Sequence, residues 1–183
     1  MIRSFIALPL PDEVRDVLDD LQTGLKAGRL VLPENLHITL AYLDKQTPQT
    51  LDRVHEVLEQ MRVAPFHITL KGVDVFGGNK PRLVWAGVEP SPQLTDLREK
   101  VRRAAMRSGV DLARERFRPH VTLSRLNRQG KPRGLAGLET FLAKHAQFET
   151  APFLATEIVF YRSTLHPDGA TYDPMVTYSL LPP

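Results

Sequence analysis

The chain has 183 residues, of which 42% are hydrophobic and 25% are charged, and its net charge is +3. These values exclude a disordered chain and favour one globular domain. The apolar stretches are too short for a transmembrane helix or a secretion signal, so we expect a cytoplasmic protein without membrane association. The absence of cysteine excludes disulfides, a thiol nucleophile and cysteine-ligated metal centres.

Strands and helices alternate in the pattern of the first half of the chain. Residues 11–27 carry apolar side chains at helical spacing, and Gly28 offers a stop signal. Thr47 is a candidate N-cap for a second helix. The expected elements are strands 2–8 and 36–43 and helices 11–27 and 48–61.

The same alternation continues in the second half. A third helix is expected to start at Ser91-Pro92 and to end at Gly109. A loop rich in glycine and charge is expected over residues 127–134. The other expected elements are strands 66–76, 83–88, 120–126, 155–165 and 171–181 and a short helix over 135–144.

Positive charge gathers in one part of the chain. Between residues 114 and 133 there are seven basic residues and one acidic residue, Glu115, which gives this window a charge of +6. Such a patch indicates a polyanionic partner such as RNA or a nucleotide, although a solvated basic loop would have the same composition. The basic residues are Arg114, Arg116, Arg118, Arg125, Arg128, Lys131 and Arg133.

Three of the six histidines begin a pattern of histidine, an apolar residue, threonine and a second apolar residue. The patterns start at His37, His67 and His120. Because alternate residues of a strand face the same side, each histidine projects beside its threonine while the apolar residues face a core. A lone histidine in a strand is usually structural, and spacing alone does not separate the three.

Two such strands facing each other would complete an acid–base site. One neutral imidazole would remove a proton from the attacking oxygen, and the other, as imidazolium, would protonate the leaving oxygen. The hydroxyls would hold the non-bridging oxygens of a phosphate. This chemistry needs no metal, and no nearby paired carboxylates or cysteines complete a metal shell, so we expect neither a metal nor a cofactor.

The sequences around two of these patterns are alike and lie 83 residues apart. Residues 34–43 and residues 117–126 both carry a leucine three residues after the pattern, which suggests an internal duplication. We therefore expect an α+β, bilobal duplicated fold. Two antiparallel sheets would face a central cleft, with helices packed on the outside, and residues 1–183 would form a single domain of two pseudo-symmetric lobes.

In these motifs the sequence resembles the 2H phosphoesterase superfamily, which is named for two His-x-Thr-x motifs. Within it, the chain is most similar to bacterial and archaeal RNA 2′,3′-cyclic phosphodiesterases, also described as 2′-5′ RNA ligases. The resemblance covers nearly the whole chain. The segments that carry it are residues 3–9, 33–40, 81–88, 116–123 and 163–172.

The resemblance implies a role for each site residue. His37 would donate the proton to the leaving ribose 3′ oxygen, and His120 would activate water, although the residues alone do not distinguish acid from base. Thr39 and Thr122, the threonines of the two motifs, would bind the substrate. Arg125 matches a family arginine expected near the phosphate, but strict alternation places it on the face opposite His120, so a twist or bulge is needed.

The implied activity is metal-independent hydrolysis of RNA 2′,3′-cyclic phosphate ends to 2′-phosphomonoesters. The expected partners are RNA with such ends and small cyclic nucleotides, and the expected state is a monomer. Two alternatives stay open: a 2′-5′ RNA ligase or phosphodiesterase activity of the same site, and a non-catalytic module that binds RNA ends. The resemblance attaches no catalytic role to His67, and we interpret His55, His145 and His166 as structural or surface groups.

Overall fold

The computed structural model describes residues 1–78, 80–126, 137–167 and 169–182. The helices are α1 (Asp12–Thr23), α2 (Pro48–Glu59), α3 (Pro92–Arg107) and α4 (Leu138–Lys144), with a 3-10 turn at Pro33–Asn35. The strands are β1 (Ile2–Pro9), β2 (Arg29–Leu30), β3 (His37–Gln46), β4 (Phe66–Ile68), β5 (Leu70–Phe76), β6 (Leu83–Val88), β7 (His120–Arg125), β8 (Phe153–Ala155), β9 (Glu157–His166) and β10 (Gly169–Ser179).

Side-chain caps start two of the helices. The Thr47 hydroxyl accepts a hydrogen bond from the Thr50 amide at the start of α2, as predicted. Ser91 caps α3 in the same way through the Leu94 amide. Both helices have proline in the first turn, where its missing N–H costs nothing.

The prediction that the first helix extends to residue 27 was wrong. The helix ends at Thr23, and Gly28 adopts a φ of +74° just before β2. A Cβ on Gly28 would lie 2.6 Å from the carbonyl oxygen of Arg125. The glycine therefore permits a close approach of this turn to β7 and does not end the helix.

The large sheet has the strand order β10-β9-β1-β3-β7-β6-β5, with β2 also paired to β7, and all its pairings are antiparallel. This confirms the α+β class. The two antiparallel halves that we expected to face each other are parts of one large sheet, joined at β3 and β7, where the register contains the single pair Ile38 and Val121. The halves join at this point because Ile38 and Val121, which are both fully buried, belong to the same core.

The expected strand over residues 66–76 is two strands in different sheets. β4 pairs with β8 in a separate two-stranded sheet, whereas β5 pairs with β6. β8 had not been predicted as a separate strand. β4 and β8 have only three residues each, which is too short for an alternating pattern to indicate a strand or its pairing partner. The predicted loop over 127–134 lies outside the described residues.

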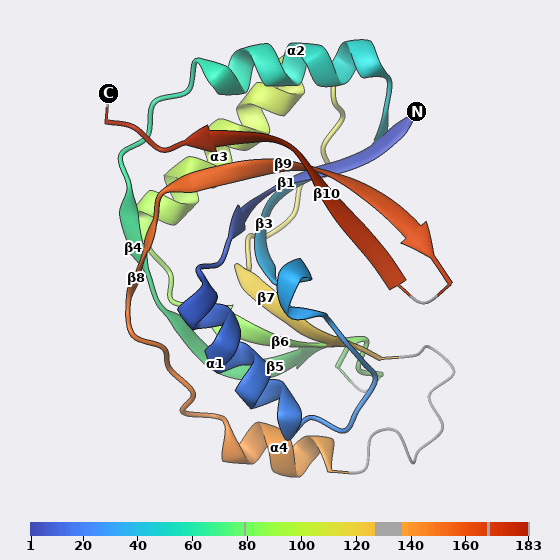
Figure 1. Cartoon of the computed structure of the whole chain (residues 1–183), viewed down its shortest axis with the longest axis vertical. Coiled ribbons are helices and arrows are strands. Elements are labelled where there is room, and N and C mark those ends of the chain that lie inside the picture. The colour runs from blue at the N-terminus through green and yellow to red at the C-terminus, as the bar shows by residue number, and fades with distance from the viewer. Residues whose placement is uncertain (79, 127–136, 168, 183) are drawn as a thin grey trace.

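The helices lie on the outside of the strands, as expected. α2 and α3 lie near one end of the molecule and α1 and α4 near the other, with the strands between them (Figure 1). Within the described ranges, no helix is both long and apolar enough to cross a membrane.

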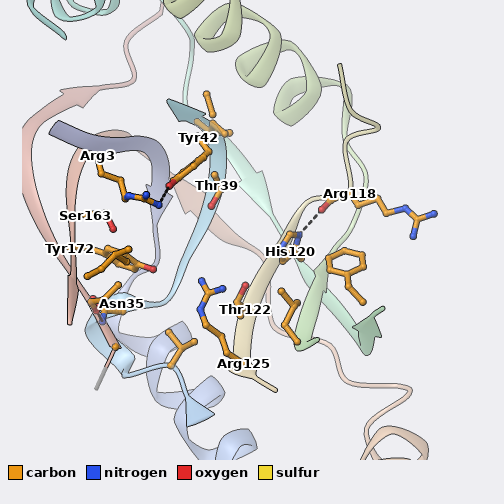
Figure 2. A pocket seen from close by; sticks show the side chains of 18 of the residues that line it. Arg3, Asn35, Thr39, Tyr42, Arg118, His120, Thr122, Arg125, Ser163 and Tyr172 are labelled. Atoms are coloured by element: carbon orange, nitrogen blue, oxygen red, sulfur yellow. Dashed lines mark hydrogen bonds between the residues drawn. The ribbon is translucent and has the colours of Figure 1, made fainter. Parts of the chain in front are cut away.

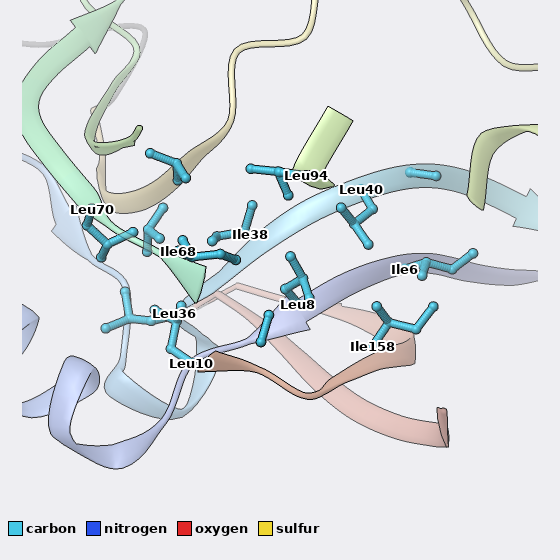
Figure 3. Packing of buried hydrophobic residues seen from close by; sticks show 14 of the residues in the cluster. Ile6, Leu8, Leu10, Leu36, Ile38, Leu40, Ile68, Leu70, Leu94 and Ile158 are labelled. Carbon is cyan, nitrogen blue, oxygen red and sulfur yellow. The ribbon is translucent and has the colours of Figure 1, made fainter. Parts of the chain in front are cut away.

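One core cluster contains residues of the motif strands, of other strands and of all four helices. Ile38 and Val121 are both fully buried. Leu94 of α3 and Leu8 of β1 belong to the same cluster and lie near Ile38 (Figure 3). Full burial of one such side chain contributes about 1.5–3 kcal/mol. Because Ile38 and Val121 face this core, the residues on either side of each must face the other side of the sheet.

Candidate active site

The two His-x-Thr motifs lie side by side in the sheet. Ile38 pairs with Val121 in antiparallel register, so the histidine and threonine that flank Ile38 share a face with those that flank Val121. Thr39, His120 and Thr122 all line one pocket on that face. The structure thus brings together motifs that are 83 residues apart in the sequence.

The ring of His37 is held from several sides. Its Nδ1 lies 2.7 Å from the carbonyl oxygen of Asn35, so this nitrogen carries the proton and donates it. Its Nε2 lies 3.1 Å from the hydroxyl oxygen of Thr39. The ring packs against Phe5, with centroids 4.8 Å apart, and against Tyr172, with centroids 5.3 Å apart. His37 is partly buried by these contacts.

His120 is held by an equivalent hydrogen bond. Its Nδ1 lies 2.7 Å from the carbonyl oxygen of Arg118, again two residues earlier in the chain (Figure 2). Its ring lies nearly perpendicular to the Phe76 ring, with centroids 4.9 Å apart, and Trp85 of the neighbouring strand β6 lies 6.1 Å away, centroid to centroid. In both histidines the Nδ1–H group donates a hydrogen bond to a backbone carbonyl oxygen. The Nε2 atom is therefore the one available for proton transfer.

Arg125 lines the same pocket as His120 and Thr122. Trp85 of β6 pairs with Thr122 and the adjacent Val84 pairs with Ser124, so β7 has one additional residue between them. This bulge shifts the alternation of the strand by one residue. It is the irregularity that the sequence analysis required to place Arg125 beside His120.

The pKa values of both histidines lie below the ordinary range. Burial lowers the pKa of His37 to about 4, with further contributions from the positive charges of Arg125 and His120. Burial also lowers the pKa of His120, and the guanidinium of Arg125 adds to that effect. Both rings are therefore neutral at pH 7 in the unliganded site, and the charge of Arg125 reaches both of them.

The pocket has a volume of about 1070 Å³, larger than a typical pocket for one small molecule. His37 is not among the residues that line it. Thr39 and Tyr172 both contact the His37 ring, and both line the pocket. The ring therefore lies directly behind residues that form the pocket surface. Figure 2 shows Thr39, Tyr42, Arg3 and Tyr172 on one side of the pocket and His120, Thr122 and Arg125 on the other.

Tyr42, which was not predicted as a site residue, lines the pocket at the position equivalent to Arg125. Each lies five residues after its motif histidine, and β3 contains the same kind of register shift, between Ile6 and Ala7 of β1. The likeness of residues 34–43 and 117–126 was the signal for this equivalence, because it places Tyr42 opposite Arg125. Tyr42 is 47% exposed.

A second missed residue, Arg3, holds Tyr42 in place. Its guanidinium donates a 2.6 Å hydrogen bond to the Tyr42 hydroxyl and lies 3.5 Å from the carboxylate of Asp44. The first half thus presents a fixed aromatic ring where the second half presents a guanidinium.

The other histidines have different surroundings. His67 lies exposed on β4, away from the pocket, and His55 hydrogen-bonds the Tyr178 hydroxyl. His145 follows the last residue of α4. His166, interpreted as a structural or surface group, is exposed and lines the pocket at the end of β9. Within the described ranges, no three histidine or carboxylate side chains gather as a set of metal ligands.

This arrangement agrees with comparison to known proteins. A model of the 2′-5′ RNA ligase superfamily matches residues 10–167. The chain belongs to this superfamily. The family resemblance of the sequence is therefore confirmed.

Two curated relatives of this superfamily member carry the same name, RNA 2′,3′-cyclic phosphodiesterase. The protein of Geobacillus stearothermophilus is 30% identical over 184 residues, which cover 97% of this chain and 57% of the relative. This chain thus spans little more than half the length of that relative. The protein of Archaeoglobus fulgidus is 34% identical over 137 residues, which cover 70% of this chain and 74% of the relative.

The fold also matches solved structures. The crystal structure of Escherichia coli LigT complexed with 3′-AMP superimposes with a TM-score of 0.80 at 26% identity, and the match covers 98% of each chain. The architecture described above is therefore that of a LigT-like protein.

Proposed function

We propose that this chain hydrolyses RNA 2′,3′-cyclic phosphate ends to 2′-phosphomonoesters by metal-independent catalysis with two histidines. The observation that carries the proposal is the pairing of β3 with β7, which sets both His-x-Thr motifs on one face beside a pocket. The names of the two relatives and the nucleotide bound to LigT support the substrate class.

In the proposed reaction, His120 is the base. Its Nε2 accepts a proton from water as the water oxygen forms a bond to phosphorus. The bond from phosphorus to the ribose 3′ oxygen breaks, and His37, as imidazolium, gives its Nε2 proton to that oxygen. The products are a 2′-phosphate and a 3′-hydroxyl, and proton exchange with solvent restores the two histidines.

Three other residues act on the phosphate in this scheme. The hydroxyls of Thr39 and Thr122 donate hydrogen bonds to its non-bridging oxygens, and the guanidinium of Arg125 stabilises the charge that develops on them. The Thr39 hydroxyl, which lies beside His37 Nε2 in the unliganded site, must turn toward the phosphate.

The acid role of His37 depends on the substrate. Its pKa of about 4 leaves the ring neutral at pH 7 until a negative charge is placed beside it. The phosphate anion provides that charge and raises the pKa of the ring. Without a bound phosphate, the low pKa of His37 would suit this ring better as a base than as an acid.

The superfamily name favours a second activity of the same site. With a 5′-hydroxyl in place of water, the two histidines could join RNA ends: the 5′ oxygen bonds to phosphorus, the bond to the 3′ oxygen breaks, and a 2′-5′ linkage forms. By microscopic reversibility, the same groups could cleave a 2′-5′ linkage to the cyclic phosphate and a 5′-hydroxyl. Rates on cyclic-phosphate RNA and on 2′-5′-linked dinucleotides would rank these activities. A non-catalytic module that binds RNA ends would bind the cyclic phosphate without forming product.

The decisive experiment compares three alanine variants in the presence of EDTA. We expect His37→Ala and His120→Ala each to abolish hydrolysis of a cyclic-phosphate RNA end. His67→Ala is the matched control, because His67 begins the same pattern but lies away from the pocket. Full activity of either first variant, with folding verified by circular dichroism, would refute the assignment.

The proposal also includes the setting in which the enzyme works. We propose a cytoplasmic monomer whose residues 1–183 form a single domain of two pseudo-symmetric lobes, with RNA 2′,3′-cyclic phosphate ends and small cyclic nucleotides as partners. Neither a metal nor a cofactor takes part in the scheme.

A further inference from the structure

Three exposed arginines follow one another at every second position beside the pocket. Residues 111–119 connect α3 to β7 without regular secondary structure, and Arg114, Arg116 and Arg118 are all exposed along this connection. Two residues of chain span at most about 7 Å, so the Cα atoms of successive arginines in this row lie no further apart than that.

The residues between these arginines are anchored to α3. The guanidinium carbon of the buried Arg98 lies 4.5 Å from the centre of the Phe117 ring, and Arg98 also contacts the Glu115 carboxylate at 3.5 Å. Arg102, also buried, donates a 2.7 Å hydrogen bond to the carbonyl oxygen of Ala113. These contacts fasten the connection to α3, while Arg114, Arg116 and Arg118 stay exposed.

The connection contains two acidic residues, Asp111 and Glu115, and neither forms an ion pair with these arginines among the described residues. Glu115 lies within ion-pair distance of Arg98 and Arg102, which belong to α3. Among the residues that the structure describes, no carboxylate lies within 4.0 Å of Arg114, Arg116 or Arg118. Three positive charges therefore face solvent along this connection.

The row of arginines is continuous with the pocket. Arg116 and Arg118 line the pocket, and the Arg118 carbonyl oxygen holds the proton on His120 Nδ1. In Figure 2 the Arg118 guanidinium points away from Thr122 and Arg125. A polyanion that places its end between the motifs and leaves past His120 would pass over these arginines.

We propose that Arg114, Arg116 and Arg118 bind the phosphodiester backbone of the RNA strand that precedes the cyclic end. This proposal rests on the proposed function and deepens it, because it makes an RNA strand of several nucleotides a better substrate than a mononucleotide. Guanidinium groups bind phosphates through charge-assisted hydrogen bonds and read no base, so the preference is independent of sequence.

The salt dependence of binding gives the number of phosphates that these arginines neutralise. For a single strand, the logarithm of affinity falls with the logarithm of salt concentration with a slope of about −0.7 per neutralised phosphate. Three contacts give a slope of about −2.1, so a change from 50 to 200 mM salt weakens this part of binding about 18-fold. A mononucleotide cyclic phosphate lacks these contacts.

The test measures kcat/KM for a hexanucleotide with a cyclic-phosphate end and for a mononucleoside cyclic phosphate. We expect the ratio of the two values to fall about 18-fold between 50 and 200 mM salt in the wild type. In the triple variant Arg114→Gln, Arg116→Gln and Arg118→Gln, the ratio should be lower at 50 mM salt and nearly independent of salt.

A matched triple variant controls for net charge. Lys100, Arg103 and Arg107 are exposed on α3, belong to a separate surface pocket, and are replaced by glutamine in this control. The control should keep the wild-type ratio and salt slope. Equal slopes for the wild type and the first variant, or an equal loss in the control, would overturn the proposal.

Binding without turnover separates this proposal from the proposed function. Fluorescence anisotropy with a hexanucleotide that ends in a 2′-phosphate measures the affinity and its salt slope directly. If neither cyclic substrate is hydrolysed, the proposed function fails, and a wild-type slope steeper than that of the Arg114, Arg116 and Arg118 variant still supports the arginine contacts. Identical anisotropy slopes in both proteins would overturn the arginine contacts alone.

Discussion

Replacement of His37 by glutamine should reduce the loss of stability at acidic pH. The folded protein holds the pKa of His37 at about 4, whereas an unfolded histidine titrates near 6.5. Between these values the unfolded chain binds a proton that the folded chain does not. The contribution of neutral His37 to stability is therefore complete above pH 6.5 and is lost as the pH falls toward 4.

The size of this effect follows from the two pKa values. Between pH 7 and pH 4.5, the proton taken up at this position by the unfolded chain costs the wild type about 2 kcal/mol of unfolding free energy. His37→Gln keeps a side-chain N–H for the Asn35 carbonyl but does not titrate. The wild type should therefore lose about 2 kcal/mol more than the variant over this range.

Urea unfolding at pH 7.0, 6.0, 5.0 and 4.5 measures the difference. The other five histidines are shared by both proteins, so their contributions largely cancel. Parallel curves for the wild type and His37→Gln would refute the argument that burial keeps this ring neutral.

The same ring can be followed with a ligand bound. A nucleoside 2′-phosphate should raise the NMR-measured pKa of His37 toward the neutral range, as the acid role requires. A pKa that stays near 4 in the complex would exclude His37 as the acid at pH 7 and would assign that role to His120.

Three further changes test the pocket. Arg125→Gln should lower kcat/KM by about 10²-fold or more. It should also raise the pKa of both motif histidines, because the positive charge of Arg125 lowers both values in the wild type. Unchanged histidine titrations by NMR would contradict this. Gly28→Ala should cost about 1–3 kcal/mol of unfolding free energy, since its Cβ would lie 2.6 Å from the Arg125 carbonyl oxygen; an unchanged urea midpoint would rule out the close approach. Tyr42→Leu should raise KM about 10-fold, because it removes a surface on which a base can stack. Tyr42→Phe keeps the ring and should keep most of the affinity. Equal KM values for the two variants would exclude a stacking role.

Local patterns in the sequence were enough to locate the motif strands. The alternation of His37, Ile38 and Thr39 places the imidazole and the hydroxyl on one face of a strand, and this depends only on strand geometry. The caps at Thr47 and Ser91 were predictable for the same reason, because a cap bonds an amide only three residues away. The need for a bulge before Arg125 also followed from counting residues along one strand.

The pairing of the two motifs was decided by the tertiary structure. The contact of Ile38 with Val121 joins strands from distant parts of the chain, and it depends on how both pack against the same core. The same packing brings Arg3 to Tyr42 and His166 to the edge of the pocket. A side chain's facing direction is set by its neighbours in the chain, whereas its partners across the pocket are set by the packing of the whole molecule, which no local pattern encodes.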